Sequence, residues 1–158
     1  MSKYTYANKT ETSSEKSRID IEKNLKRYGA RNFMYATQDN RAGIMFECNG
    51  KRVKFILVLP NQGARQFTHT PTGQPRAAHT QEKEWEQACR SKWRSLNMII
   101  HAKLEAVKSG ITVFDEEFLP YIVLPNSQTV AELMLPRIEH AYQHNTMPAL
   151  IPMLEVGV

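Results

Sequence analysis

Residues 32–60, NFMYATQDNRAGIMFECNGKRVKFILVLP, decide the fold because apolar and polar side chains alternate along three short segments. Such alternation places successive side chains on opposite faces of a sheet. The segments are separated by two turn-forming clusters, QDN and NG, and the pair Asn49-Gly50 is a strong hairpin signal because both residues tolerate a positive φ. The stretch predicts a three-stranded antiparallel meander, with strands at 32–37, 42–48 and 51–59.

A helix is predicted on each side of this meander. Thr12 and Glu15 have the spacing of a capping box, and Ile21 and Leu25 follow on one helical face, which predicts a helix at 13–28. A longer helix at 81–109 is predicted by apolar residues at steps of three and four. This apolar stripe comprises Trp85, Cys89, Trp93, Leu96, Ile100, Leu104 and Val107.

The remaining segments are less regular. The polar residues 1–12 predict a flexible tail, and the 19 residues at 61–79, with two glycines and two prolines, predict a mobile loop. Thr112 and Thr129 each stand three residues before an acid, which predicts two short capped helices. Pro136 is expected to kink the second of them.

The 158 residues are enough for one domain of ordinary size. Residues 121–124 predict either an edge strand or an extended segment, and the apolar residues 147–158 predict an extended strap. We therefore expect a single α+β domain at 13–158. In it, a three-stranded antiparallel β-meander packs against an N-terminal helix and one long helix, with a C-terminal helical cap.

Basic residues dominate the first two thirds of the chain, and acids dominate the last third. The net charge is +5, with 20 Lys and Arg against 10 Asp and Glu up to Gly110, whereas Arg137 alone faces six acids from Ile111 onward. A basic body attracts polyanions, and nucleic acid is the commonest of these in a cell. No apolar run approaches the ~20 residues of a membrane helix, and the N-terminus lacks the apolar segment of a secretory signal. We expect no membrane partner.

No catalytic or metal-binding constellation stands out. His140 and His144 have the spacing to hold one metal ion, but a third ligand is missing. Cys48 and Cys89 fall on predicted apolar faces and are interpreted as core residues. Neither a P-loop nor a dinucleotide-binding fingerprint occurs. We expect a protein that is not an enzyme and that has no cofactor and no metal.

The nucleic-acid hypothesis depends on cations that recur along the predicted elements. Arg90 and Arg94 begin a basic stripe that continues to His101 and Lys108 on one side of the long helix. Binding to a phosphate backbone needs such repeated cations within reach of successive phosphates. The candidate nucleic-acid-binding residues are Arg41, Lys51, Arg52, Lys54, Arg65, Arg76, Arg90 and Arg94.

Two aromatic residues near these cations, Tyr35 and Phe67, are candidates for stacking on bases. The alternative interpretation is a solvated charged face above ordinary core aromatics. For each element taken singly, the sequence leaves both interpretations open.

Three stretches carry a resemblance to known proteins: RYGARNFMYATQDNRAGIMFECNGKRVKFILVLP (27–60), WRSLNMIIHAKLEAVKSGITVFDEEFLPYIVLP (93–125) and TVAELMLPRIEHAY (129–142). They are similar to uncharacterised small proteins encoded by tailed phages and prophages. The resemblance carries no catalytic motif. It implies expression in the cytoplasm of a bacterial host, where small phage proteins act on nucleic acid or block a host or defence protein.

The sequence therefore supports two functional hypotheses. The first is a non-enzymatic phage or prophage accessory protein that contacts the backbone of DNA or RNA. The alternative is an inhibitor of the anti-CRISPR kind, which would bind a bacterial defence or nucleic-acid-handling protein through Asp115, Glu116 and Glu117. Whether the long apolar stripe forms the core of a monomer or the seam of a homodimer also stays open.

Overall fold

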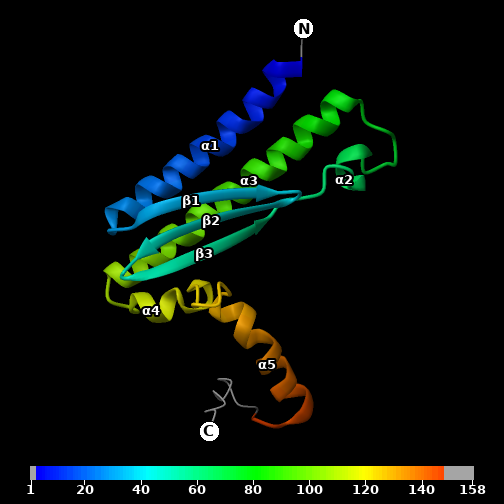
Figure 1. Ribbon diagram of the computed structural model, residues 1–158. Helices are drawn as coiled ribbons and strands as arrows, with labels where there is room; N and C mark the ends of the chain where they lie inside the picture. The colour runs from blue at the N-terminus through cyan, green and yellow to red at the C-terminus, as the bar shows by residue number, and fades with distance from the viewer. Residues whose placement is uncertain (1–2, 148–158) are drawn as a thin grey trace.

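The computed structural model describes the backbone of residues 3–147 and the side chains of residues 15–147. It has the predicted α+β order, with three consecutive strands between an N-terminal helix and a long helix (Figure 1). The elements are α1 (Lys3–Arg27), β1 (Arg31–Gln38), β2 (Arg41–Cys48), β3 (Lys51–Val58), α2 (Arg65–Thr68), α3 (Ala78–Lys108), α4 (Phe114–Glu117), the 3-10 helix η1 (Leu119–Tyr121) and α5 (Val130–His144).

The three strands form one antiparallel sheet in the order β1-β2-β3, as the alternating pattern predicts. Ile44 lies opposite Tyr35 on one side and Phe55 on the other, so these three side chains share a face. Asn49 and Gly50 form the β2–β3 turn with φ of 51° and 73°, the conformation that only residues tolerant of positive φ adopt at low cost.

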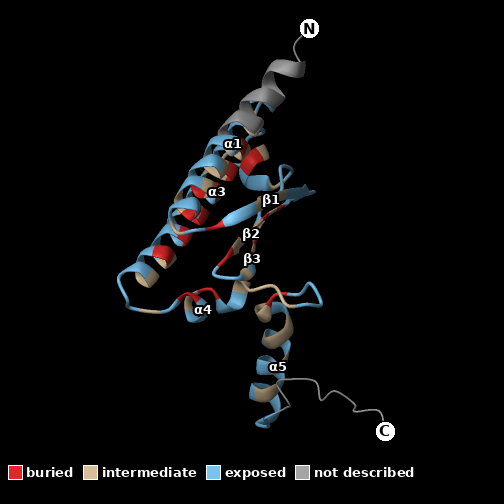
Figure 2. Ribbon diagram, turned by 60° about the vertical axis from the view of Figure 1, so that its left-hand side comes forward, coloured by how far each residue is buried: buried red, intermediate tan, exposed pale blue. Residues whose placement is uncertain are grey.

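One face of the sheet is covered by α1 and α3 (Figure 2). The core lies between these layers, where Phe46 and Val53 of the sheet and Ile21 and Ile100 of the helices are fully buried. The predicted stripe of α3 is therefore used inside the chain. Five of its seven residues are buried in the core of the single chain.

Helices α1 and α3 lie side by side and run in the same direction (Figure 1). Asn24 of α1 is next to Asn97 of α3, and one turn further along Tyr28 is next to Glu105. The parallel direction has a simple cause. An odd number of strands returns the chain to the end of the sheet at which α1 begins, so the following helix retraces the path of α1.

The N-terminal helix begins earlier than predicted. The structure has α1 from Lys3, so the helix start at Thr12 and the separation of residues 1–12 as a tail are both corrected for residues 3–12. The physical reason is that no glycine or proline interrupts Lys3–Arg27. The spacing of Thr12 and Glu15 is therefore compatible with a helix interior.

Residues 61–79, for which the sequence predicts a mobile loop, are folded back on themselves. Helix α2 lies in this segment, and His69 forms an isolated β-bridge with Pro75. The backbone N–H of Arg76 donates to the carbonyl of Thr68 at 2.8 Å, and Phe67 is buried. Helix α3 then begins at Ala78, three residues before the predicted start.

The C-terminal elements follow the prediction in part. Thr129 and Glu132 form the predicted capping box of α5, whereas Thr112 does not cap α4. The first turn of α4 begins after Val113 instead. Residues 122 and 123 make only isolated bridges, with Val53 and Thr129, so the segment is extended rather than a full edge strand. Apart from Met147, the predicted strap at 147–158 lies outside the described residues.

Helix α5 extends away from the sheet and its two covering helices (Figures 1 and 2). Pro136 lies inside this helix, and none of its 15 residues is buried. In the part of the chain that the structure describes, no helix combines the length and the apolar character needed to cross a membrane.

Candidate nucleic-acid interface

The parallel packing of α1 and α3 creates a groove along their shared outer side. Residues spaced three or four apart lie on one side of each helix, so each helix contributes one row of side chains. We call this feature the α1–α3 groove. Its lining residues are Lys16, Ser17, Asp20, Asn24, Arg27 and Tyr28 of α1 and Arg90, Arg94, Asn97, His101, Glu105 and Lys108 of α3.

A side-chain hydrogen bond crosses the middle of the groove. The amide nitrogen of Asn24 lies 2.9 Å from the amide oxygen of Asn97, and this contact is half-buried. Hollows of about 270 Å³ and 330 Å³ lie on either side of it, the first beside Lys16 and Arg94 and the second beside Arg27. Lys16, Arg27, Arg94 and Lys108 are exposed, so these cations are accessible to a ligand lying along the helices.

Positive charge exceeds negative charge in the groove, where five lysines and arginines and His101 face only Asp20 and Glu105. The Tyr28 hydroxyl donates a hydrogen bond to the Glu105 carboxylate. This bond raises the pKa of Tyr28 and lowers the pKa of Glu105. Glu105 is thus held ionised by a neutral donor within the groove.

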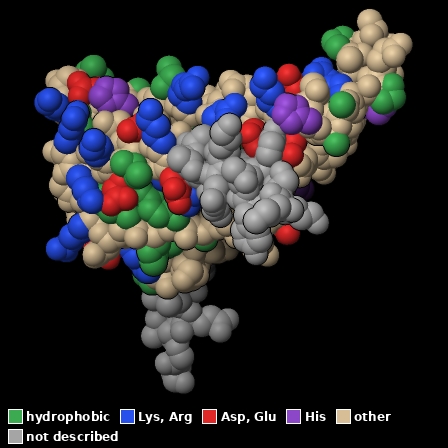
Figure 3. All heavy atoms as spheres, turned by 90° about the horizontal axis from the view of Figure 1, so that it is seen from above, with side chains coloured by type: hydrophobic (Ala, Val, Ile, Leu, Met, Phe, Trp, Pro, Cys, Tyr) green, Lys and Arg blue, Asp and Glu red, His purple; other side chains and the backbone are tan. Residues whose placement is uncertain are grey.

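Most of the groove cations have no acid in contact. Within residues 15–147, Lys16, Arg27, Arg94 and Lys108 form no ion pair. The fifth, Arg90, lies 4.0 Å from Glu86 and donates to the side-chain oxygen of Gln87 at 2.7 Å. Figure 3, which looks down on the side where α1 and α3 lie, shows many Lys and Arg side chains interspersed with acids.

The structure brings Arg90 and Arg94 together in this groove, and the predicted basic stripe does continue along α3 to His101 and Lys108. Sequence reasoning did not select Lys16 or Arg27 of α1. The helical spacing places both residues on the side of α1 away from Ile21 and Leu25, and this could have indicated an exposed basic row. The parallel packing of α1 beside α3 could not be predicted from the sequence.

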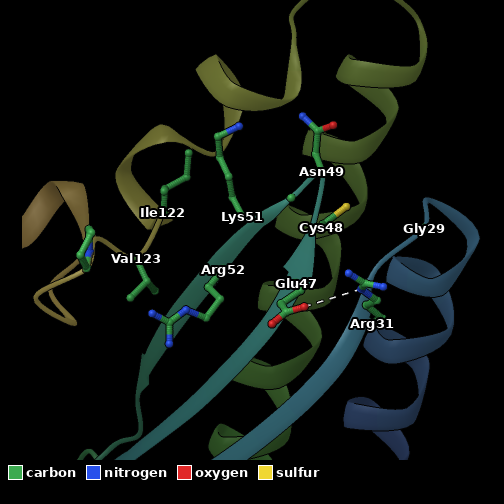
Figure 4. Close-up of a pocket in the computed structure, with 11 residues that line it drawn as sticks. Gly29, Arg31, Glu47, Cys48, Asn49, Lys51, Arg52, Ile122 and Val123 are labelled. Atoms are coloured by element: carbon green, nitrogen blue, oxygen red, sulfur yellow. Dashed lines mark ion pairs between the residues drawn. The ribbon is translucent and has the colours of Figure 1, made fainter.

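The cations of the sheet do not join this groove. Lys51 and Arg52 line a separate hollow of about 790 Å³ at the β2–β3 turn, together with Arg31. Figure 4 shows Lys51 and Arg52 pointing in different directions, while Arg31 reaches Glu47 at 3.6 Å. The cations therefore do not converge on one anion.

The other predicted cations are dispersed or partly neutralised. Lys54 is half-buried and lies 3.5 Å from Glu132, and Arg76 is half-buried and lies 3.7 Å from Glu84. Arg41 is exposed at the start of β2, and Arg65 is exposed on α2. The eight predicted residues thus do not form one continuous surface, because the sheet and the helix layer present them on different sides.

Neither aromatic candidate is placed to stack on a base. Phe67 is buried against the body of the protein, with 5% of its surface exposed. The Tyr35 ring is half-buried under the Arg18 guanidinium, 5.8 Å away, and its hydroxyl donates to Glu22 at 3.0 Å. Burial is also the main reason why the pKa of Tyr35 is raised. The prediction of base stacking by these two residues is therefore wrong for this conformation.

The acidic cluster at residues 115–117 is largely paired. Asp115 lies 2.9 Å from the Lys51 ammonium, and Glu117 lies 3.0 Å from Lys103. Only Glu116 has no ion pair among the described side chains. The cluster that the alternative hypothesis uses as a binding surface therefore helps to hold α4 against β3 and α3.

The histidines and cysteines considered for metal binding or covalent chemistry do not form a reactive site among the described residues. His140 and His144 stack with ring centroids 4.1 Å apart, but within the described residues no three His, Cys, Asp or Glu side chains gather closely enough to hold a metal. Cys48 and Cys89 are both buried, as predicted. Burial raises the pKa of both thiols, so they are poor nucleophiles near neutral pH.

Comparison with protein-family models, with curated proteins and with solved structures gives no match.

Proposed function

We propose that this protein binds the phosphate backbone of nucleic acid along the α1–α3 groove and performs no catalysis. The observation that supports the proposal is the pair of parallel helices, which presents Lys16, Arg27, Arg94 and Lys108 with no ion pair to any side chain that the structure describes. Unpaired cations in a row can release counterions from successive phosphates, which is the main source of backbone affinity.

The groove is long enough for several phosphates. Arg90 and Lys108 are 18 positions apart on α3, which corresponds to roughly 27 Å at ~1.5 Å per residue. Lys16 and Arg27 cover roughly 16 Å of α1 alongside it. A ligand lying along the helices would therefore contact cations from both rows.

The groove offers little for reading a base sequence. Apart from its charged residues it presents mainly the Asn24 and Asn97 amides, which are bonded to each other, and Tyr28, whose hydroxyl is bonded to Glu105. Phosphate contacts fix position without reporting sequence. We therefore propose binding with little sequence preference, in the bacterial host setting that the phage resemblance implies.

The protein-binding alternative receives less support. Two of its three acids, Asp115 and Glu117, are occupied by ion pairs to Lys51 and Lys103. A partner protein would have to break these pairs to use the carboxylates. The α1–α3 groove requires no such rearrangement, and for that reason we favour the nucleic-acid proposal.

The test is fluorescence anisotropy with labelled single- and double-stranded DNA and RNA, using the wild-type protein and two double variants. Lys16→Glu/Arg94→Glu reverses one cation on each side of the groove. The matched control, Arg65→Glu/Lys92→Glu, makes the same charge change at two exposed cations outside the groove. The groove variant is expected to bind at least about tenfold more weakly than wild type, whereas the control stays much closer to it.

Two results would reject the proposal. The first is the absence of binding to any of the four polymers at low salt, where backbone affinity is greatest. The second is an equal loss of affinity in both double variants, which would mean that only the net charge matters and not the groove.

A further inference from the structure

Helix α5 has an apolar face that no other described residue covers. Leu135, Ile138 and Tyr142 lie on one side of this helix and are 61%, 41% and 86% exposed. An isolated helix of 15 residues is marginal in water, and Pro136 removes one of its backbone donors. An amphipathic helix of this kind is normally stabilised by packing its apolar face against another surface.

The outer face of the sheet, opposite the two covering helices, is a second uncovered apolar surface. Met34, Ile56 and Val58 point outward here and are 57%, 51% and 56% exposed. On the central strand β2, Met45 belongs to the same face and is paired with Met34, and the Ile56 side chain lies over Gly43, with its Cδ1 3.5 Å from the position that a Cβ of residue 43 would take. The centre of this face therefore carries apolar side chains that a partner's apolar helix face can cover.

The charges on the two surfaces are complementary. Four cations surround the outer sheet face, namely Arg31, Arg41, Arg52 and Lys54, with Glu47 as the acid between them. On α5, Glu139 stands on the same side as Leu135 and Tyr142. Glu132, at the start of α5, already pairs with Lys54 at 3.5 Å. The contact between the acidic side of α5 and the basic sheet thus begins within one chain.

The same chain cannot complete this contact. Helix α5 starts beside β3 and then extends away from the sheet, which separates its exposed face from the sheet of its own chain (Figures 1 and 2). A second copy supplies the missing surface without any change in the fold. The two surfaces can be used reciprocally, as two-fold symmetry requires for a closed dimer.

We propose that the protein forms a symmetric homodimer in which α5 of each copy packs on the outer sheet face of the other. Leu135, Ile138 and Tyr142 then cover Met34, Ile56 and Val58, and Glu139 lies among the cations around that face. This arrangement is independent of the α1–α3 groove, which is on the other side of the sheet.

The experiment measures molar mass by sedimentation velocity for the full chain at roughly 100 μM, where a dimer with a micromolar Kd is almost fully formed. Leu135→Asp/Ile138→Asp disables α5, and Ile56→Asp/Val58→Asp disables the sheet face. Each variant alone alters both contacts of the symmetric dimer, and we expect it to raise the dimer dissociation constant about a thousandfold, which leaves the variant mostly monomeric at this concentration. Ile111→Asp is the matched control, because Ile111 is 82% exposed and belongs to neither surface.

Mixing the two variants gives the decisive result. One chain keeps an intact sheet face and the other keeps an intact α5, so the proposal predicts a heterodimer that neither variant forms alone. Recovery of the dimer also shows that both variants remain folded. A monomeric wild type, a dimer unaffected by either variant, or a mixture that stays monomeric would each overturn the proposal. A dimer lost in only one of the two variants would also overturn the proposal, and would point to pairing of α5 with α5 or of sheet with sheet.

Discussion

Burial raises the pKa of the Cys89 thiol to about 11, and the nearby Glu86 carboxylate adds to this effect. Burial also raises the pKa of the Cys48 thiol. Because the thiolate is the reactive form, both residues should be almost inert at pH 7 to 8 while the protein is folded. Each side chain also lies inside the core, where a reagent has no access.

The expected result is slow labelling of native protein by a thiol-specific chromophoric reagent, and rapid labelling of two thiols after unfolding in denaturant. The unfolded sample is the control for reagent and stoichiometry. Rapid labelling of either residue in the native protein would show that the core around it is open.

Ile99 and Ile100 are neighbours on α3 with opposite environments, which provides a matched test of the core. Ile100 is fully buried, whereas Ile99 is 48% exposed. Ile100→Ala is expected to lower the free energy of unfolding by about 2–5 kcal/mol, because it removes buried apolar surface and leaves a cavity. Ile99→Ala should change it by less than about 1 kcal/mol. Urea denaturation measures both, and similar losses would contradict the assignment of the core.

At the scale of elements, the start of α5 is fixed by the Thr129–Glu132 capping box. The backbone N–H of Thr129 donates to the Glu132 carboxylate at 2.7 Å, and the N–H of Glu132 donates to the Thr129 hydroxyl at 3.1 Å. Thr129→Ala should therefore cost about 1 kcal/mol of local stability in α5. Thr112→Ala is the control, because Thr112 makes no such cap on α4.

The same capping box makes the stability of α5 depend on pH, and the direction of this dependence follows from the pKa of Glu132. The hydrogen bond from the Thr129 backbone lowers the pKa of Glu132 below its ordinary value of 4.5. The ionised carboxylate therefore stabilises α5 fully above about pH 4.5, and this stabilisation is lost as the pH falls through the lowered pKa. Amide hydrogen exchange should show α5 opening more readily on acidification. Glu132→Gln should weaken that pH dependence, and an unchanged profile would contradict the role of the box.

Local signals in the sequence predict most of the elements. Alternation in residues 32–60 and the Asn49-Gly50 turn predict the sheet, and the apolar stripe from Trp85 to Val107 predicts α3. The start of α1 is predicted wrongly because a local signal is misleading there. Thr12 and Glu15 have the spacing of a capping box, but the helix runs without interruption from Lys3. Helix boundaries are decided by such competition between similar local energies.

At the scale of the whole molecule, the candidate site depends on contacts between distant parts of the chain. Lys54 forms an ion pair with Glu132, and Lys51 forms one with Asp115, so neither lysine is a free cation. In each pair the acid is more than 60 positions away in the sequence. The α1–α3 groove arises because three strands bring α3 back parallel to α1. Neither effect has a signature in sequence spacing, which explains why half of the groove and the pairing of the sheet cations were not predicted.

The proposed binding of nucleic acid along the α1–α3 groove is best tested by measuring how the affinity depends on salt concentration. The plot of log affinity against log salt has a slope of roughly −0.9 per neutralised phosphate on duplex DNA, or −0.7 on a single strand. If the groove binds the backbone, Lys16→Glu/Arg94→Glu makes this slope shallower by about two phosphate contacts, whereas Arg65→Glu/Lys92→Glu leaves it at the wild-type value. Equal slopes for all three proteins, or a shift only in the control, would contradict it.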